Sequence, residues 1–78
     1  MATKFYIELG SILKEYRLSH SLTQQDVADR LRVSRSTIAS WESGRRVIYA
    51  DDLFRYCDVL NVDPNIVCNK VRKYLYKD

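Results

Sequence analysis

The stretch that decides the fold is Leu22–Arg46, which reads LTQQDVADRLRVSRSTIASWESGRR. It predicts two short helices joined by a tight turn. Thr23 is a start signal for the first helix, because its hydroxyl can accept a hydrogen bond from an unpaired first-turn N–H group. Asp26 places a negative charge at the positive end of the helix dipole, and it approximates the Glu or Gln of a capping box without being one. The apolar stripe of this helix is then Val27, Ala28 and Leu31.

The second helix of this stretch begins after Ser34, another residue suited to an N-cap, so that only Arg32 and Val33 remain for the turn. Ile38 and Trp41 lie about 60° apart around a helix that turns about 100° per residue. Both side chains must therefore point inward. The outward face is then small and polar, and it consists of Ser36, Ala39, Ser40 and Ser43.

Arginines flank this outward face. Arg35 opens the helix, Gly44 is expected as its left-handed C-cap, and Arg45 and Arg46 follow in the loop. Small side chains let a helix approach base edges in the major groove, where Ser and Arg supply donors for purine acceptors. A solvated face of an ordinary surface helix has a similar composition. The face alone therefore leaves both interpretations open.

The formal net charge of +3 is unevenly distributed. Residues 30–46 carry five arginines against one Glu, whereas residues 1–29 carry three Lys or Arg against four Asp or Glu. Residues 47–78 are balanced, with five basic against five acidic side chains. The excess positive charge thus lies on the turn, the second helix and the following loop, as expected for phosphate contact; the alternative is a solvated arginine-rich surface.

Length and composition favour one all-α domain over residues 1–78. Apolar residues make up 46%, with only two glycines and one proline, as in a compact helical bundle. No apolar run is long enough for a signal peptide or membrane helix, so we expect a cytoplasmic protein. Two cysteines without metal-ligand spacing, a single histidine and no phosphate loop predict no disulfide, metal, cofactor or enzymatic activity.

Three further helices are expected around the central pair. The first runs from about Ile7 to Ser19, and its apolar stripe is Leu9, Ile12, Leu13 and Tyr16. The fourth begins near Asp51, ends at Asn61, and turns Leu53, Tyr56, Cys57 and Leu60 inward. The fifth begins at Asp63–Pro64 and extends to about residue 77. Its stripe of Val67, Val71, Tyr74 and Leu75 suits either a core or a subunit contact.

The segment Gln24–Ser43 resembles the helix-turn-helix of phage repressor and Cro proteins, the family also named for the xenobiotic response element. The match includes Gln24, Ala28, Val33, Ile38 and Trp41. Gly10–Arg17 and Leu53–Val62 resemble the first and fourth helices of that family. The chain departs from the pattern where Arg32 replaces the turn glycine and where Ile48 and Tyr49 replace the usual Pro-Ser.

The resemblance implies a five-helix, lambda-repressor-like domain with its core at about residues 7–67. It further implies a bacterial or phage-encoded, nucleoid-associated regulator that binds double-stranded DNA, here expected to be a repressor. Because one such domain reads few bases, we expect a homodimer on an inverted-repeat operator. The alternative is a protein-interaction domain of the same fold, such as an antitoxin or antirepressor.

Site residues follow from the two helices and the resemblance together. The side chains expected at base edges are Arg35, Ser36, Thr37 and Ser40. Those expected at the DNA backbone are Gln24, Ser43, Arg45 and Arg46. The family also implies a partly buried ion pair between Arg17 and Glu42. The expected dimer contact is the last-helix stripe of Val67, Val71, Tyr74 and Leu75, with the loop Val47–Tyr49 as the alternative.

Overall fold

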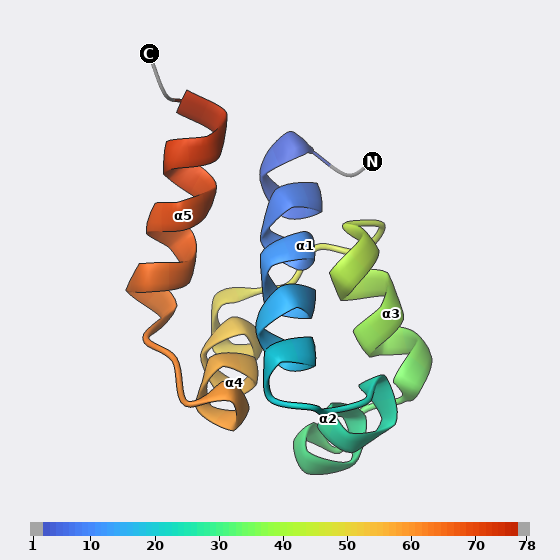
Figure 1. Ribbon diagram of the computed structural model, residues 1–78. Helices are drawn as coiled ribbons and strands as arrows, with labels where there is room; N and C mark the ends of the chain where they lie inside the picture. Colours follow the sequence, from blue (N-terminus) through green and yellow to red (C-terminus); the bar gives the residue numbers. More distant parts are fainter. Residues whose placement is uncertain (1–2, 77–78) are drawn as a thin grey trace.

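The computed structural model describes residues 3–76, which form five helices and, over that range, no strand. The helices are α1 (Lys4–Ser19), α2 (Gln24–Leu31), α3 (Arg35–Ser43), α4 (Ala50–Leu60) and α5 (Pro64–Tyr76). Figure 1 shows α1 in the middle, with α3 on one side and α5 on the other. The prediction of a compact five-helix all-α domain is confirmed.

The two central helices begin where the sequence predicts. The Thr23 hydroxyl accepts a hydrogen bond from the N–H of Asp26 at 3.0 Å, and the Ser34 hydroxyl accepts one from the N–H of Thr37 at 3.1 Å. The expectation that Asp26 only approximates a capping-box residue was wrong. Its carboxylate accepts a hydrogen bond from the N–H of Thr23 at 2.8 Å, so the shorter Asp side chain completes the box.

The first helix begins three residues earlier than predicted, at Lys4 instead of Ile7. Thr3 precedes it in extended backbone but makes no side-chain cap, and no acidic residue lies in the first turn. No local start signal therefore marks this end, and the half-buried Phe5 and Tyr6 packed against the core hold it. At the other end of the chain, α5 is described to Tyr76, and the predicted extension to residue 77 lies outside the described residues.

The turn between α2 and α3 depends on a left-handed arginine. Arg32 has φ 59°, the conformation that glycine usually supplies and that costs other residues about 1–2 kcal/mol. The N–H of the next residue, Val33, donates to the carbonyl of Ala28 at 3.1 Å and closes the end of α2. Arg32 therefore takes up the turn geometry without a change of fold.

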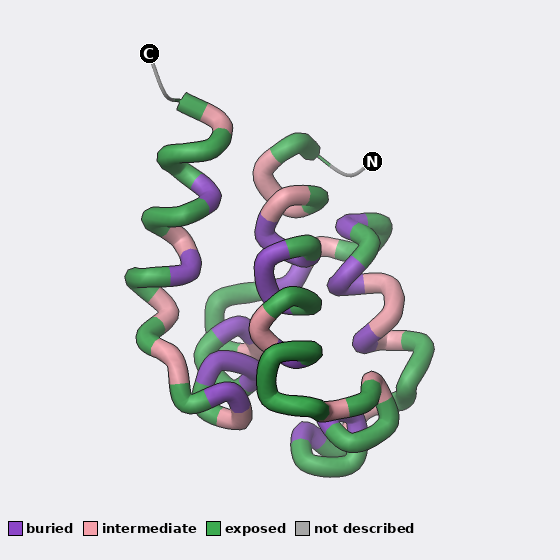
Figure 2. The backbone as a smooth tube through the Cα atoms, viewed as in Figure 1, coloured by how far each residue is buried: buried purple, intermediate pink, exposed green. Residues whose placement is uncertain are grey.

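One core joins all five helices, as the buried positions in Figure 2 show. α1 and α3 approach each other closely at Gly10, where a Cβ atom would meet the carbonyl oxygen of Trp41 and would lie 2.6 Å from that of Glu42. Ala28 of α2 is fully buried, as expected for a small residue at a helix crossing. The crossing of α1 and α3 through Gly10 was not anticipated.

The C-terminal stripe divides between core and surface. Val67 and Val71 are fully buried within the single chain, so their assignment to a subunit contact is corrected: they are core residues. Tyr74 is 64% exposed and Leu75 is half-buried. In the apolar loop, Ile48 closes the core whereas Tyr49 is exposed.

Three other features concern the described residues 3–76. No helix there combines the length and the apolar character needed to cross a membrane. Cys57 is a buried free thiol whose pKa burial raises to about 11, and Cys68 is a half-buried free thiol. Within the same range, no cluster of three or more His, Cys, Asp or Glu side chains could hold a metal ion.

Candidate nucleic-acid interface

Helix α3 has one buried and one accessible face. Ile38 is fully buried and Trp41 is 4% exposed, so the predicted inward pair is confirmed. The accessible side carries exposed Arg35, Ser36 and Ser43, with Thr37, Ala39 and Ser40 half-buried. α3 therefore presents short polar side chains to a ligand, with an arginine at its start.

The N-terminal end of α3 holds a cluster of hydroxyl groups. The Ser34 oxygen lies 3.0 Å from that of Ser36 and 2.9 Å from that of Thr37. Ser34 already accepts the N–H of Thr37. Each hydroxyl can both donate and accept a hydrogen bond. These three side chains can therefore replace their hydrogen bonds to one another by hydrogen bonds to a ligand.

The C-terminal end of α3 leads into an arginine-bearing loop. Gly44 takes φ 77° there, and a Cβ at this position would lie 2.8 Å from the backbone nitrogen of Ile7. The N–H of Arg45 donates to the Ser43 hydroxyl at 3.3 Å, and the N–H of Arg46 donates to the Ser40 carbonyl at 3.2 Å. Both arginine side chains are exposed.

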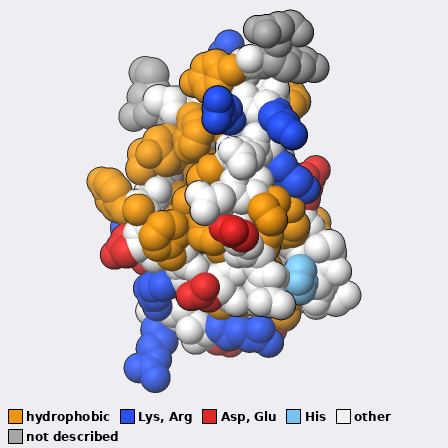
Figure 3. Space-filling model, turned by 90° about the vertical axis from the view of Figure 1, so that its left-hand side faces the viewer, with side chains coloured by type: hydrophobic (Ala, Val, Ile, Leu, Met, Phe, Trp, Pro, Cys, Tyr) orange, Lys and Arg blue, Asp and Glu red, His pale blue; other side chains and the backbone are white. Residues whose placement is uncertain are grey.

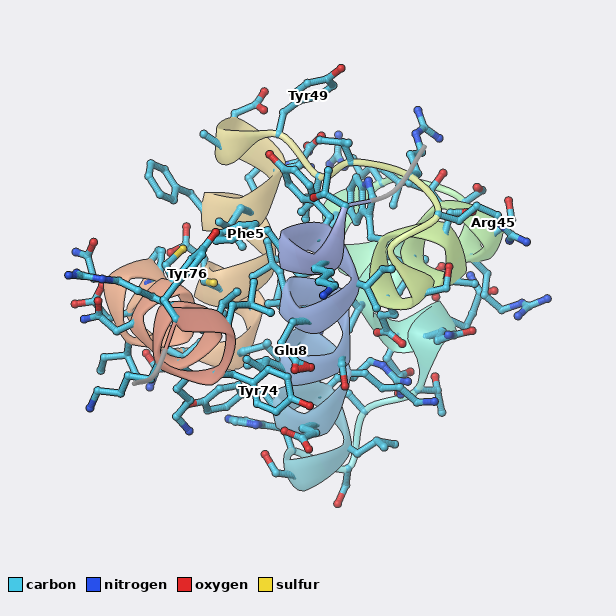
Figure 4. The ribbon with its side chains drawn as sticks, turned by 90° about the horizontal axis from the view of Figure 1, so that it is seen from above. Phe5, Glu8, Arg45, Tyr49, Tyr74 and Tyr76 are labelled. Atoms are coloured by element: carbon cyan, nitrogen blue, oxygen red, sulfur yellow. The ribbon has the colours of Figure 1, made fainter. Side chains whose placement is uncertain are left out.

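These loop arginines lie on the α3 side of the molecule. Figure 4 shows Arg45 beside α3, with α1 between it and Tyr74 and Tyr76 of α5. The guanidinium of Arg45 reaches back to the Ser40 hydroxyl at 3.5 Å. The loop and the accessible face of α3 therefore form one continuous polar and basic surface.

The expected ion pair between Arg17 of α1 and Glu42 of α3 is present and buried. Arg17 Nε lies 2.7 Å from Glu42 Oε2, and Arg17 Nη2 lies 3.0 Å from Oε1. The third guanidinium nitrogen, Nη1, donates to the carbonyl of Leu22 at 2.7 Å. This bidentate pairing fixes the back of α3 against α1.

Two further partners of Glu42 were missed by the sequence reasoning. The Tyr56 hydroxyl on α4 donates to Oε2, and Gln24 Nε2 on α2 donates to Oε1 at 3.1 Å. Tyr56 was identified only as an inward apolar residue, although a buried tyrosine hydroxyl requires a partner, which was the available signal. Glu42 thus ties α3 to all three of the helices α1, α2 and α4.

The four hydrogen bonds keep Glu42 ionised. Burial raises the pKa of its carboxyl group, but the hydrogen bonds from Arg17, Tyr56 and Gln24 together outweigh it, and the net pKa lies below the ordinary 4.5. The hydrogen bond to Glu42 raises the pKa of Arg17. Burial, followed by the bond to Glu42, raises the pKa of Tyr56, so its proton stays on the phenol. Glu42 and Arg17 are therefore a charged pair at neutral pH.

Gln24 connects the buried pair of Arg17 and Glu42 to the accessible face of α3. Its Oε1 accepts a hydrogen bond from Arg35 Nη1 at 3.3 Å, while its Nε2 faces Glu42. The sequence had placed Gln24 only at the DNA backbone. The structure brings it together with Arg35, the first residue of α3.

The arrangement of α2, the short turn and the exposed face of α3 defines a class: DNA-binding regulators of transcription with a helix-turn-helix. A helix-turn-helix family model matches residues 13–67, which is most of the chain. The chain belongs to the helix-turn-helix family.

A curated relative matches part of the chain. It is an uncharacterized HTH-type transcriptional regulator of Methanocaldococcus jannaschii, 54% identical over 33 residues. The match covers 42% of this chain and 50% of that protein, so the chain spans half the length of this relative.

Solved structures share the fold over most of the chain. The clp gene regulator ClgR from Corynebacterium glutamicum has a TM-score of 0.86 at 22% identity, with 95% of this chain and 96% of that chain covered. The restriction-modification controller protein C.AhdI from Aeromonas hydrophila has a TM-score of 0.75 at 22% identity, with 80% and 94% covered. At these identities the likeness establishes the fold.

Proposed function

We propose that the protein is a sequence-specific repressor of transcription that places α3 in the major groove of double-stranded DNA. The observation that carries the proposal is the asymmetry of α3. Its buried face is anchored to three other helices through Glu42, while its accessible face is free of large side chains and flanked by arginines. Small residues permit the close approach that base reading requires.

The base-reading side chains in this proposal are Arg35, Ser36, Thr37 and Ser40. Arg35 is exposed at the start of α3, where a recognition helix meets base edges with its N-terminal residues. Its guanidinium can pair with O6 and N7 of guanine. The hydroxyls of Ser36 and Thr37 can rotate toward a base after releasing Ser34.

The DNA backbone is held in this proposal by Ser43, Arg45 and Arg46, together with Gln24 at the start of α2. The exposed arginines supply charge, and the helix start contributes the positive end of a dipole. Contacts of this kind set register and orientation without reading sequence. They complement the base contacts from α3.

We infer that two copies bind an inverted-repeat operator, with recognition helices about 34 Å apart. α5 and the start of α1 carry a groove of about 560 Å³, lined by Lys4, Ile7, Glu8, Tyr74 and Leu75. Figure 4 shows Glu8 and Tyr74 facing the same space between these helices. Figure 3 shows hydrophobic side chains along the α5 side of the molecule.

A second copy of the chain suits this groove because the groove carries one positive and one negative side chain, Lys4 and Glu8. A twofold axis presents the same patch on both subunits, so Lys4 of one copy can meet Glu8 of the other around the apolar center. Val67 and Val71 are excluded from the contact because the single chain buries them fully.

A gel shift on duplex DNA from upstream of the protein's own gene tests the function. We expect retardation of that duplex at protein concentrations that leave an unrelated duplex of equal length free. Reporter expression should then fall when the protein is supplied. Absence of selective retardation, with retention of a protein partner, would instead favour an antitoxin or antirepressor.

A further inference from the structure

We propose that Arg32, the left-handed residue in the turn between α2 and α3, binds a phosphate group of the DNA backbone. The inference rests on the proposed function, and it adds a contact at the end of α3 opposite to Arg45 and Arg46. Three observations carry it: the unfavourable backbone conformation of Arg32, the hydrogen bonds that hold this backbone in place, and the availability of its guanidinium group.

The backbone of Arg32 has a conformation that suits other residue types better. Its φ of 59° lies in the left-handed region, where glycine has no steric conflict and asparagine is tolerated. The other non-glycine residues with positive φ among residues 3–76 are Ser21 and Asn61, and of the three only Arg32 is charged. Unfavourable conformations of this kind cluster at functional sites. We therefore expect the side chain to have a role in binding.

Hydrogen bonds on both sides of Arg32 hold its backbone in place. The N–H of Val33 donates back to a carbonyl of α2 at 3.1 Å. On the other side, the guanidinium of Arg55 on α4 donates to the carbonyl of Leu31. Arg55 is itself paired with Asp52 at 3.2 Å. The side chain of Arg32 is therefore attached to a well-fixed backbone, although the conformation is unfavourable for an arginine.

The guanidinium of Arg32 is available for a ligand. Arg32 is exposed, and within residues 3–76 no hydrogen bond, ion pair or cation–π contact engages its side chain. Its neighbours in the fold differ, since Arg17, Arg35, Arg45 and Arg55 each donate to an intramolecular acceptor. A guanidinium carries five donors in a planar fork, which matches two oxygens of a phosphate group. The Arg32 side chain therefore contributes charge to the surface without a partner in the described chain.

Arg32 and the loop arginines lie at opposite ends of α3. Figure 1 shows the turn between α2 and α3 at one end of α3 and the loop that leads to α4 at the other. Nine residues at about 1.5 Å each give α3 a length of roughly 13 Å, close to the major-groove width of about 12 Å. Arginines at both ends can therefore meet phosphates on both sides of the groove. Because Arg32 precedes α3 itself, it suits the border of the groove better than the base edges.

Arg32→Gly tests the proposal, because glycine keeps the left-handed backbone and removes only the side chain. The protein should unfold at an equal or higher temperature, whereas its affinity for duplex DNA should fall. Fluorescence anisotropy measures affinity for an unrelated duplex and for one that the wild type selects from a randomised library. Both affinities should fall alike, since phosphate contacts carry no sequence information. The slope of log affinity against log salt should decrease by about 0.9.

Asn61→Gly is the matched control. Asn61 also has a left-handed backbone, with φ 53°, and is exposed, but it ends α4 and carries no charge. This variant should leave affinity and salt slope unchanged. Arg32→Lys keeps a charge that can contact phosphate, so it should retain most of the slope. Arg32→Gly combined with Arg45→Gln/Arg46→Gln should reduce the slope by the sum of the separate reductions, because the contacts are independent.

Two results would overturn the proposal. An unchanged salt slope in folded Arg32→Gly would show that the guanidinium stays in solvent when DNA is bound. Loss of discrimination at a single base pair would instead make Arg32 a base contact. Arg32→Asn, which also tolerates the left-handed backbone, replaces Arg32→Gly if that variant does not fold. Failure of the wild type to enrich any sequence would refute the proposed function itself, which is a separate outcome.

Discussion

The Tyr56 hydroxyl on α4 and the Arg17 guanidinium on α1 share one acceptor, Oε2 of Glu42 on α3. All three residues are nearly inaccessible to solvent. A buried ion pair alone gains little, because desolvation offsets the attraction. The contribution of the pair lies in geometry, since its hydrogen bonds fix the back of α3 relative to α1 and α4.

Tyr56→Phe tests the contribution of the shared hydroxyl. The ring keeps its packing, including its contact with Trp41, while the hydrogen bond to a charged acceptor is lost. We expect the free energy of unfolding to fall by about 1.5–3 kcal/mol, measured by urea denaturation. Tyr49→Phe is the control, because Tyr49 is 71% exposed and its loss of a hydroxyl should change little. Equal effects of the two variants would contradict this account.

The low pKa of Glu42 predicts a loss of stability in acid. Its pKa is below 4.5 in the folded state, so the unfolded chain takes up the proton first as pH falls. The stabilisation is complete above the unfolded pKa and is lost as pH decreases through the folded pKa. The hydrogen bonds between Asp26 and Thr23 lower the pKa of the Asp26 carboxyl group. Asp26 therefore also loses its contribution to stability as the pH falls.

Glu42→Gln distinguishes the contribution of the Glu42 carboxylate to acid sensitivity from that of the Asp26 carboxylate. At pH 7 it should lower the free energy of unfolding by about 3–5 kcal/mol, because it leaves Arg17 buried without a counter-charge. The difference from the wild type should shrink as the pH is lowered toward 3 in a series of urea titrations. A difference that stays constant over this range would show that the Glu42 charge is not the cause.

Gly10→Ala tests the close approach of α1 and α3. Alanine favours a helix over glycine by about 1 kcal/mol, so the change would stabilise an isolated helix. Here the new Cβ would lie 2.6 Å from the Glu42 carbonyl oxygen, a backbone atom that cannot rotate away. We expect a net loss of about 1–3 kcal/mol in thermal or urea unfolding. The neighbouring exposed Ser11→Ala should cause no such loss.

Local chemistry explains which features could be predicted from the sequence. Thr23, Ser34 and Asp63 mark helix starts through bonds to residues two or three positions away, so their signals are contained in short segments. The start of α1 at Lys4 has no such signal and depends on tertiary packing. The link between Gln24 and Arg35 also arises only from the angle between two helices. The outward face of α3 was predictable because helical periodicity alone determines it.

Arg45→Gln/Arg46→Gln tests phosphate contact by the loop. Each lost contact should reduce the slope of log affinity against log salt by about 0.9, with affinity lowered for specific and nonspecific duplexes alike. Anisotropy titrations at several salt concentrations measure this slope. Arg72→Gln/Lys73→Gln is matched in charge and lies on α5, across α1 from α3. This second variant should leave the slope nearly unchanged, and equal slopes for both variants would remove the loop from the interface.

Tyr74→Ala/Leu75→Ala tests the proposed contact between two copies. Tyr74 is 64% exposed and Leu75 is half-buried, so truncation should weaken dimerisation more than folding. Sedimentation equilibrium, with and without operator DNA, should show a shift toward monomer. Tyr49→Ala, which removes the exposed aromatic of the alternative loop contact, should remain dimeric.

The charges of the groove supply a sharper version of this test. Lys4→Glu alone should weaken self-association, because two like charges then meet around the twofold axis. Adding Glu8→Lys should restore association, since the exchanged pair is complementary again. Restoration by the second change separates a contact between copies from a loss of folding. A dimer unaffected by any of these variants, but abolished by Tyr49→Ala, would move the interface to the loop before α4.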